Sequence, residues 1–521
     1  MTTSRPARPP QAVQGFERSE GEVIASFGTW ATGTGPIYRR LADGIRKAIE
    51  GGSLPPGQRI PSERQLATVL RVSRTTVVAA YEALRDAGLV ESRRGSGTRV
   101  AATARPTRSI SDGRVPGGTG SSMYQRLIEG PGDLISLTCS AEGAVPELVA
   151  AFRELAGADL ATAFDEPGYH PAGLPELRQA IADHLTATEL PTTPDQILVT
   201  TGAHQALVLV SELYLRPGGT VLAESPSWPG CLDVLRSRGA HIVTVPLDDE
   251  GPDVRLMAEA LADRRPDLVY LMPTFHNPTG VLMSVARRRR IAELCARHDV
   301  PVIEDNAYIV QTAAVAPGPS PDASRPLGEP RDLPRLLAAY APRGAEVLSA
   351  GSLAKVIWAG LRMGWVRGPA EIVERLARRK ALADLGSPVI DQMLAARLVP
   401  QLPRIEAARA PERERRLDRI EKLLRDRLPE WRWRRPYGGS GLWIELPGVD
   451  ATEFSHVALR HGVEVVPGAV TDPSGAHDRF MRLPYTFTDE VLDLLVDRLA
   501  RAWAEIGRHG PVDTRPVRVI V

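Results

Sequence analysis

The sequence predicts an α/β protein in which a small helical N-terminal domain, closed by a β-hairpin, precedes a large domain with a mainly parallel sheet. Three observations predict this fold class. At 521 residues, the chain exceeds the roughly 100–200 residues of one ordinary domain. Apolar residues recur at helical spacing between residues 35 and 101. From about residue 132, short β-branched runs alternate with helical segments, as in sheets covered by helices.

Composition narrows the class of protein. Hydrophobic residues make up 43% of the chain and charged residues 24%, the balance of a globular protein. Residues 1–10 contain no apolar run, and no stretch resembles a membrane span, so we expect a cytoplasmic protein without membrane insertion. Cys139, Cys231 and Cys295 lack the spacing of a metal site or a disulfide framework. We expect reduced packing cysteines and no metal.

The predicted domain boundaries follow shifts in composition. Residues 1–34 are rich in Pro, Gly, Thr and Arg and are expected to form a flexible arm. Residues 102–131 have the composition of a linker, and a flexible chain of about 30 residues spans roughly 30 Å. Residues 132–521 form the large domain, with a smaller C-terminal subdomain from roughly 386 to 521. The proline-rich residues 313–334 are interpreted as an insertion loop of unassigned role.

Residues 35–101 carry the pattern of a winged helix-turn-helix. An apolar stripe at four-residue steps predicts the first helix: Ile37, Leu41, Ile45 and Ile49. Ser62 and Gln65 have the spacing of a capping box that opens a short second helix. Ser73 caps a third helix, which Gly88 ends. Two extended runs, residues 89–92 and 98–100, then predict a hairpin, the wing.

The charges of this domain indicate a polyanion partner. Between Gly35 and Ala101 there are twelve Lys or Arg residues and six Asp or Glu residues, although the whole chain carries a net charge of only +1. The third helix opens with a guanidinium and hydroxyls on its first turn, where recognition helices meet base edges and phosphates. The candidate DNA contacts are Arg64, Ser73, Arg74, Thr75, Thr76 and, at the wing tip, Arg94 and Gly95. Alternatively, the hydroxyls only cap the helix and the arginines form a solvated face.

The stretch PSERQLATVLRVSRTTVVAAYEALRDAGLVESRRGSGTRV, residues 61–100, resembles the GntR family of winged-helix repressors along its whole length. The resemblance implies that Arg64, the first turn of the third helix and the wing contact operator DNA. It adds a family context to the charge pattern, which by itself indicates only an anionic partner.

The strongest single motif in the large domain is SAGSLAKVIWAGLRMGW, residues 349–365. Lys355 lies three residues after Ser352 and seven before Arg362. This pattern predicts an imine between the lysine and the aldehyde of pyridoxal phosphate (PLP), with the serine and the arginine on its phosphate. Upstream, Gly202 and Ala203 lie between a predicted strand and helix, where backbone N–H groups favour an anion. A lone Ser-x-x-Lys would indicate only a surface lysine.

Further motifs supply contacts for the rest of this cofactor. Trp228 can stack on the pyridine ring, and Asn277 and Tyr308 can bind its phenolic oxygen. Asp305 follows an apolar strand, where its carboxylate can pair with the ring nitrogen. Each also has a purely structural interpretation: a core tryptophan, an Asn-Pro turn or a helix cap. Arg482, between apolar neighbours, binds either a structural carboxylate or the α-carboxylate of an amino-acid ligand.

Taken in order, these residues resemble the fold-type I aminotransferases between about residues 135 and 505. With the N-terminal domain, the chain resembles a MocR-type member of the GntR family, in which the aminotransferase-like domain senses an effector. The resemblance implies a head-to-tail homodimer and an approach of Tyr169 to the neighbouring subunit's phosphate. Asn277 is nearer to working aminotransferases than to many regulators of this type, and Ala354 replaces a common hydroxyl residue.

The favoured hypothesis is therefore a dimeric, PLP-dependent transcription regulator that binds operator DNA and senses PLP, an amine or an amino acid. The alternative is an active aminotransferase with a DNA-binding appendage, in which Lys355 moves the α-proton and Arg482 orients the substrate. A sensor that has lost its cofactor ranks last, since every expected contact residue is present. The run Arg287 to Arg290 is interpreted as the solvated start of a helix and not as a nucleic-acid site.

Overall fold

The computed structural model describes residues 20–28, 30–31, 35–93, 97–101, 134–138, 140, 142–158, 160, 165–308, 333–472 and 474–508. The chain divides into two units, residues 1–128 and 129–521. The predicted linker and nearly all of the proline-rich insertion lie outside the described residues. No helix within the described ranges is long and apolar enough to cross a membrane.

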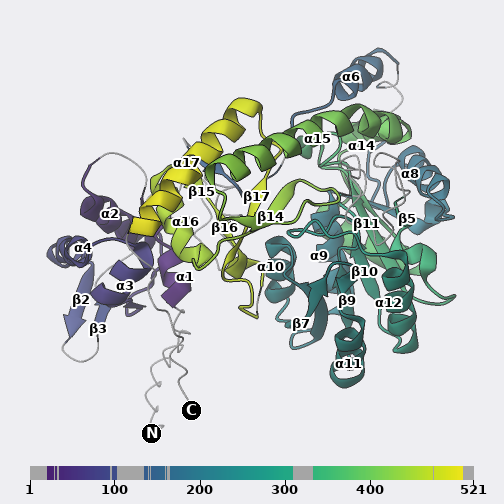
Figure 1. The fold of residues 1–521 in the computed structure, drawn as a ribbon. Coiled ribbons are helices and arrows are strands. Elements are labelled where there is room, and N and C mark those ends of the chain that lie inside the picture. The colour runs from purple at the N-terminus through teal and green to yellow at the C-terminus, as the bar shows by residue number, and fades with distance from the viewer. Residues whose placement is uncertain are drawn as a thin grey trace, which may run out of the picture. The chain divides into compact units, whose positions relative to one another are not determined.

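The N-terminal unit is a winged helix-turn-helix (Figure 1). Its principal elements are α2 (Ile37–Glu50), β1 (Arg59–Ile60), α3 (Glu63–Leu70), α4 (Arg74–Asp86), β2 (Val90–Arg93) and β3 (Gly97–Val100). The strands form an antiparallel sheet in the order β1-β3-β2. The predicted capping box is present, because Ser62 Oγ accepts the N–H of Gln65 at 3.3 Å and the Gln65 side chain accepts the N–H of Ser62 at 3.1 Å. Sequence patterning therefore located α2, α3 and α4.

The expectation of a flexible arm through residue 34 is wrong for the described residues between 20 and 31. This segment contains a helix, α1 (Glu20–Ala25), and buries Val23, Phe27 and Trp30, which are at most 5% exposed. It approaches α2 at Gly44, where a Cβ atom would lie 2.4 Å from Cβ of Trp30. The composition of this segment is that of a loop, but its apolar residues recur at helical spacing and pack against Gly44. These contacts order the segment.

The C-terminal unit contains an eight-stranded mixed sheet in the order β5-β12-β11-β10-β9-β6-β7-β8. The strands are β5 (Ile197–Thr200), β6 (Thr220–Ser225), β7 (His241–Asp248), β8 (Gly251–Pro252), β9 (Leu268–Leu271), β10 (Val302–Asp305), β11 (Val347–Ser352) and β12 (Gly364–Arg367). From β7 to β11 neighbouring strands are parallel, whereas β12 is antiparallel to both its neighbours and β8 to β7. The alternation of short β-branched runs with helical segments is confirmed, because such runs form β5, β6, β7, β9 and β10.

Helices cover both faces of this sheet. They are α6 (Pro146–Ala158), α8 (Pro175–Ala187), α9 (Ala203–Tyr214), α10 (Pro229–Ser237), α11 (Val254–Arg264), α12 (Val285–Arg297), α13 (Ala370–Asp384) and α14 (Val389–Leu398). In β9, Leu268 and Tyr270 pack with α9, α10 and α13, while Val269 and Leu271 pack with α11 and α12. The alternation of side chains along a strand thus produces two cores, as expected for an α/β/α sandwich.

A smaller subdomain follows around a second sheet in the order β13-β14-β17-β16 (Figure 1). Its elements are β13 (Arg432–Trp433), β14 (Gly441–Glu445), α16 (Ala451–Arg460), β16 (Val466–Pro467), β17 (Phe480–Pro484) and α17 (Asp489–Arg508). A separate strand pair joins β4 (Ile135–Ser136) to β15 (Val463–Glu464). The long helix α15 (Leu402–Arg427) packs in both the large and the small subdomain, because Leu402 and Ile405 pack with β5 and Leu417 packs in the small subdomain. Short 3₁₀ turns complete the unit: η1 (Pro194–Gln196), η2 (Leu337–Tyr340), η3 (Ala359–Leu361), η4 (Val399–Gln401) and η5 (Gly468–Val470).

Three minor expectations can also be compared with the fold. The arginine run does begin α12, but its interpretation as solvated is wrong for Arg288, which is 0% exposed. The Arg288 guanidinium donates to the carbonyls of Met283 and Pro273, at 3.0 and 2.7 Å, so it holds loops together. Cys231 and Cys295 are buried free thiols, as predicted, while Cys139 lies outside the described residues. The described residues contain no cluster of acidic, histidine or cysteine side chains suited to a metal ion.

Candidate functional site

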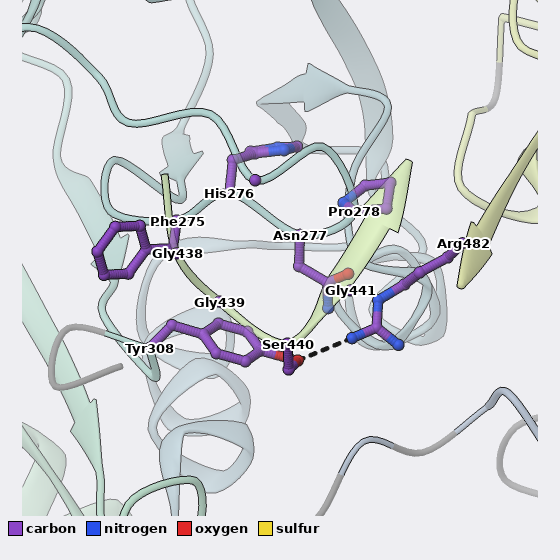
Figure 2. Close-up of a pocket in the computed structure, with 11 residues that line it drawn as sticks. Phe275, His276, Asn277, Pro278, Tyr308, Gly438, Gly439, Ser440, Gly441 and Arg482 are labelled. Atoms are coloured by element: carbon purple, nitrogen blue, oxygen red, sulfur yellow. Dashed lines mark hydrogen bonds between the residues drawn. The ribbon is translucent and has the colours of Figure 1, made fainter. Parts of the chain in front are cut away.

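The sheet brings distant motifs to one edge. Asp305 ends β10, Ser352 ends β11 and Gly202 follows β5, so all three lie at the carboxyl ends of strands that run in the same direction. Ligands of open α/β sheets bind at such edges. A pocket here is lined by Phe275, His276, Asn277, Pro278, Gly280, Tyr308, Gly438, Gly439, Ser440, Gly441 and Arg482 (Figure 2). Most of these residues come from the FHNPTG loop and from the turn before β14.

Lys355 lies just after β11, with its amine near this pocket. Nζ of Lys355 donates to the carbonyl oxygen of Ser140 at 3.1 Å and lies 5.5 Å from the ring centroid of Tyr308. Burial raises the pKa of Tyr308, but the charges of Lys355 and Arg482 and hydrogen bonds from the serine hydroxyls of Ser140 and Ser440 outweigh it, and the pKa falls to about 8. The amine and the phenol therefore share one electrostatic environment.

Asp305 is a buried carboxylate, 4% exposed. It accepts hydrogen bonds from the hydroxyl of Tyr270 and from the N–H of Ala307, each at 3.0 Å. Burial raises its pKa despite these bonds and despite the charge of Lys355. A carboxylate kept from water in this way is suited to a cationic partner such as a protonated ring nitrogen.

The turn after β5 forms an anion cradle. Gly202 has φ +87°, a conformation that favours glycine, and Ala203 begins α9, where first-turn N–H groups have no acceptor within the helix. Arg362 lies beside it, because a Cβ atom on Gly202 would be 3.3 Å from Nη2 of Arg362. The same Nη2 donates to the carbonyl of Thr201 at 2.8 Å. Ser352, the other predicted phosphate contact, is 5% exposed at the end of β11.

Two aromatic rings adjoin this cradle, and one of them was missed by sequence reasoning. Trp228, at the start of α10, meets His204 edge to face, with ring centroids 5.9 Å apart. His204 is the second residue of α9, and burial, followed by the charge of Arg362, lowers its pKa. Its position directly after Gly202 and Ala203 was the available signal, because first-turn helix residues lie next to a bound anion.

Arg482, on β17, lines the pocket and is 7% exposed. Its Nη2 donates to the hydroxyl of Ser440 at 2.9 Å (Figure 2) and to the hydroxyl of Ser140 at 2.9 Å, and the two hydroxyls are 2.8 Å apart. Of the two roles left open by the sequence, a structural carboxylate partner is not found among the described residues. A buried guanidinium bound only to neutral groups has capacity for an anion. Both serines escaped sequence reasoning because neither stands in a motif.

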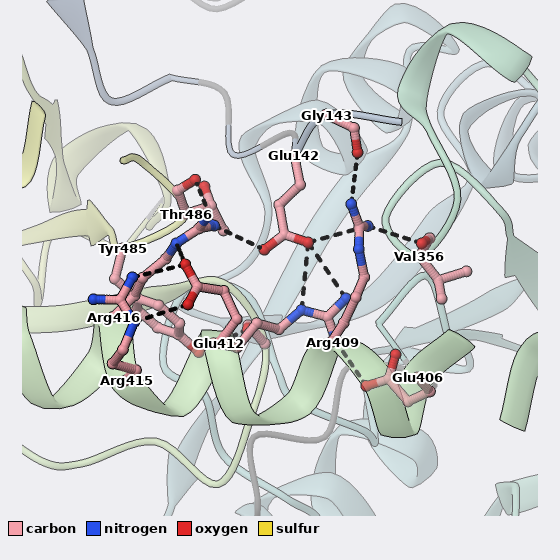
Figure 3. Close-up of polar contacts among 12 residues, drawn as sticks. Glu142, Gly143, Val356, Glu406, Arg409, Glu412, Arg415, Arg416, Tyr485 and Thr486 are labelled. Carbon is pink, nitrogen blue, oxygen red and sulfur yellow. Dashed lines mark hydrogen bonds and ion pairs between the residues drawn. The ribbon is translucent and has the colours of Figure 1, made fainter. Parts of the chain in front are cut away.

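A cluster of arginines on α15 fixes the chain that carries Ser140 (Figure 3). The carboxylate of Glu142 lies 3.2 Å from Arg409 and 3.4 Å from Arg413. Arg409 also donates to the carbonyl of Gly143 at 2.6 Å and to that of Val356 at 2.9 Å. Val356 directly follows the candidate imine-forming lysine. Arg409 therefore connects two segments, the one that follows Ser140 and the one that follows Lys355, to α15.

These residues fit pyridoxal phosphate. The cradle offers N–H groups and a guanidinium to a phosphate, Asp305 offers a carboxylate to a ring nitrogen, and Lys355 offers an amine to an aldehyde. Asn277, in the FHNPTG loop, has a buried amide oxygen without a hydrogen-bond partner in the described part of the chain, so its amide has capacity for a ligand. Tyr169, predicted to reach a partner subunit, is 68% exposed.

The candidate DNA contacts are mostly exposed on the N-terminal unit. Arg64 is exposed on α3, and the side chain of Arg74 is 70% exposed, with Nη2 3.7 Å from the carboxylate of Glu63. Ser73 Oγ accepts the N–H of Thr76 at 3.1 Å and lies 2.7 Å from the hydroxyls of Thr75 and Thr76. Ser73 therefore caps α4, and the side chains of Arg64 and Arg74 are exposed. Arg94 and Gly95 lie outside the described residues.

Comparisons with known proteins divide the chain at the same place. The model of the family "Aminotransferase class I and II" matches residues 140–499, and that of "Bacterial regulatory proteins, gntR family" matches residues 37–100. The HTH-type transcriptional regulator YisV of Bacillus subtilis is 32% identical over 87% of this chain and 92% of its own length. The regulator TauR of Rhodobacter capsulatus is 28% identical over 89% of this chain and 95% of its own.

Enzymes resemble the C-terminal unit alone. The 2-aminoadipate transaminase of Thermus thermophilus is 35% identical over 59% of this chain and 75% of its own length. The crystal structure of the α-aminoadipate aminotransferase LysN from the same organism, complexed with N-(5'-phosphopyridoxyl)-L-leucine, matches with a TM-score of 0.64 and 29% identity. That match covers 75% of this chain and 96% of the other. Only the regulators among these relatives extend over both units.

Proposed function

Because the chain belongs to the aminotransferase class I and II family and joins that domain to a GntR-family DNA-binding domain, as MocR-type regulators do, we propose that it is a PLP-dependent transcription regulator. Its effector is PLP itself or an amino compound with a carboxylate. Relatives that extend over both units are named as transcriptional regulators, which supports this proposal over an enzyme.

One observation carries the proposal: the amine of Lys355 and the buried guanidinium of Arg482 meet at the same residue, and no acidic partner of Arg482 is found among the described residues. Lys355 donates to the carbonyl of Ser140, and Arg482 donates to its hydroxyl. With PLP bound, a ligand with an amino group and a carboxylate would present its amino group to the cofactor aldehyde beside Lys355 and its carboxylate to Arg482. The pocket therefore has the chemistry of an amino-acid sensor.

PLP, when bound, supplies an aldehyde that captures amines and a ring that draws electrons from them. The chain's own residues supply the rest. Gly202, Ala203, Ser352 and Arg362 would hold the phosphate, and Asp305 would keep the ring nitrogen protonated. The remaining proposed ring contacts are Trp228, Asn277 and Tyr308.

The proposed regulation follows from thermodynamic linkage. A ligand changes DNA binding only if it binds two arrangements of the protein with different affinities. The proposed arrangement is a head-to-tail homodimer, in which the exposed Tyr169 approaches the phosphate of the neighbouring subunit. The proposed operator contacts are Arg64, Ser73, Arg74, Thr75, Thr76, Arg94 and Gly95.

A second candidate function is transamination. It is favoured by Asn277, which lines the pocket with unused hydrogen-bonding capacity, as a working enzyme would require. In that case Lys355 also carries the α-proton of the substrate, and Tyr308 with its lowered pKa can assist.

Two assays on the purified protein separate these functions. The first measures a mobility shift with DNA from upstream of its own gene, with and without PLP and candidate amino acids. The second measures turnover with amino donors and keto acids. We expect a specific, PLP-sensitive shift and little turnover. Multiple turnovers without any specific shift would contradict the proposal and favour the enzyme.

A further inference from the structure

Lys380, on α13, is a fully buried cation that is not among the residues lining the pocket described above. It is 0% exposed, and its Nζ donates to both carboxylate oxygens of Asp384, at 2.8 and 2.7 Å. A buried ammonium is costly unless it is paired and hydrogen-bonded. Asp384 is also the last residue of α13, where the helix dipole disfavours a negative charge. Helix electrostatics therefore do not explain why this pair is placed here.

The pair is continued by Gln205, a residue of α9. Nε2 of Gln205 donates to Asp384 at 2.6 Å, and its Oε1 accepts the N–H of Thr201 at 2.8 Å. On the other side of the same residue, the carbonyl of Thr201 accepts from Arg362 at 2.8 Å. Lys380, Asp384 and Gln205 thus form a hydrogen-bonded relay. The relay holds the N–H of Thr201, and Arg362 of the anion cradle holds its carbonyl.

We infer that Lys380, Asp384 and Gln205 are positioning residues for the phosphate end of the cofactor, acting through the backbone of Thr201. This inference rests on the proposed function, since it requires PLP in the cradle. Thr201 directly precedes Gly202, so the orientation of its peptide sets the direction of the N–H groups at the start of α9. Anion binding by backbone groups depends on that alignment, and supporting contacts outside the direct ligand shell maintain it.

The charge state of the relay agrees with this role. Burial raises the pKa of Asp384, but hydrogen bonds from Lys380 and Gln205 and the lysine charge lower it more, so the net shift is downward. An ionised Asp384 accepts from Nε2 of Gln205, which turns Oε1 of that amide toward Thr201. The buried lysine therefore fixes which way the glutamine amide points.

The test compares PLP with pyridoxal, which carries the same aldehyde but no phosphate. The full-length protein is freed of bound cofactor, and each vitamer is titrated while the visible absorbance of its covalent adduct with lysine is followed. Gln205→Leu should weaken PLP binding about tenfold and change pyridoxal binding less than about twofold, because only PLP uses the cradle. Gln179→Leu is the matched control: its Nε2 donates to Asp183 at 2.8 Å on the exposed face of α8.

Charge variants provide an independent check. Lys380→Met leaves the carboxylate of Asp384, whose side chain is 29% exposed, without its lysine, and should weaken PLP binding because the Gln205 amide is then held less firmly. The double variant Lys380→Met/Asp384→Asn removes both charges and should restore part of the affinity, since an asparagine oxygen can still accept from Gln205. Lys422→Met, on the exposed surface of α15, controls for loss of a lysine. Thermal unfolding of each variant reports whether the fold survives.

The outcomes distinguish this inference from the proposed function. A selective loss of PLP affinity, reversed in the double variant, supports the relay. Equal losses for PLP and pyridoxal, or no loss for either, overturn it while leaving the proposed function intact. If the unmodified protein forms no adduct with either vitamer, both the relay and the proposed function are overturned.

Discussion

The two units of this chain build their functional surfaces in opposite ways. In the N-terminal unit, the candidate DNA contacts of the described residues lie between Arg64 and Thr76, and they form hydrogen bonds with near neighbours in the chain, such as those between Ser73 and Thr76. In the C-terminal unit, Ser140 bonds to Arg482 across 342 positions and to Lys355 across 215. The candidate DNA-binding surface of the N-terminal unit is thus formed by residues close together in the chain, whereas the pocket exists only once the whole C-terminal unit has folded.

This difference predicts that variants of the pocket change the affinity for the effector, whereas variants of the N-terminal unit change the affinity for DNA. The largest effect is expected for Arg482→Leu, which removes a buried guanidinium. Affinity for a carboxylate-bearing effector should fall roughly 100-fold, because a charged hydrogen-bond partner of a desolvated group is lost. Isothermal titration against amino acids that alter DNA binding measures the change. Arg482→Lys should retain part of the affinity, and basal DNA affinity should stay unchanged. A parallel loss of DNA binding would remove the distinction between the two units.

The second effect concerns the packed N-terminal segment. Gly44→Ala places a Cβ atom 2.4 Å from Cβ of Trp30, so the segment must shift, at a cost of about 2 kcal/mol of unfolding free energy. Thermal unfolding of the full chain measures this cost. Gly21→Ala is the control, because a Cβ atom there meets nothing within 4 Å. Equal stability of the two variants would mean that the segment between residues 20 and 31 does not pack against the rest of the N-terminal unit.

A smaller effect is expected on DNA. Arg74→Ala should weaken binding to the protein's own upstream DNA about tenfold and reduce its dependence on salt. Arg85→Ala removes the same charge from the last turn of α4 and should change little. Quantitative mobility shifts at several salt concentrations provide the comparison. If both variants lose affinity equally, net charge and not the start of the recognition helix determines binding.

The smallest effect is electrostatic. Because the charge of Lys355 is among the groups that lower the pKa of Tyr308 to about 8, Lys355→Met should move that pKa upward. The sign follows from the phenolate, which a neighbouring cation stabilises. Ultraviolet absorbance of the cofactor-free protein follows the titration, and Tyr308→Phe identifies the signal. An unchanged pKa would mean that the lysine and the phenol are electrostatically independent.

The same contrast explains what the sequence could predict. Local rules located the capping box at Ser62, the cap at Ser73 and the strand end that carries Asp305, because each depends on residues nearby in the chain. Family resemblance then supplied their roles. Arg288 could not be predicted as buried, since its acceptors are carbonyls that only the folded loops bring together.

In the pocket too, the residues that could not be predicted are those whose partners lie far away in the sequence. Ser140 and Ser440 stand in no motif, yet their hydroxyls lie 2.8 Å apart and both accept from Arg482. The relay from Lys380 to Gln205 joins α13 to α9 and has no sequence pattern of its own. Residues that bind a ligand through a local turn are therefore visible in the sequence, whereas residues that position them are not.

The claim on which the rest depends is that Lys355 captures PLP in this pocket. The most direct measurement is borohydride reduction of the full-length protein after incubation with PLP, followed by mass spectrometry of its peptides. We predict a single reduced adduct, located at Lys355 and absent from Lys355→Met. A protein that takes up no reducible PLP, or takes it up only on exposed lysines such as Lys422, would contradict the claim.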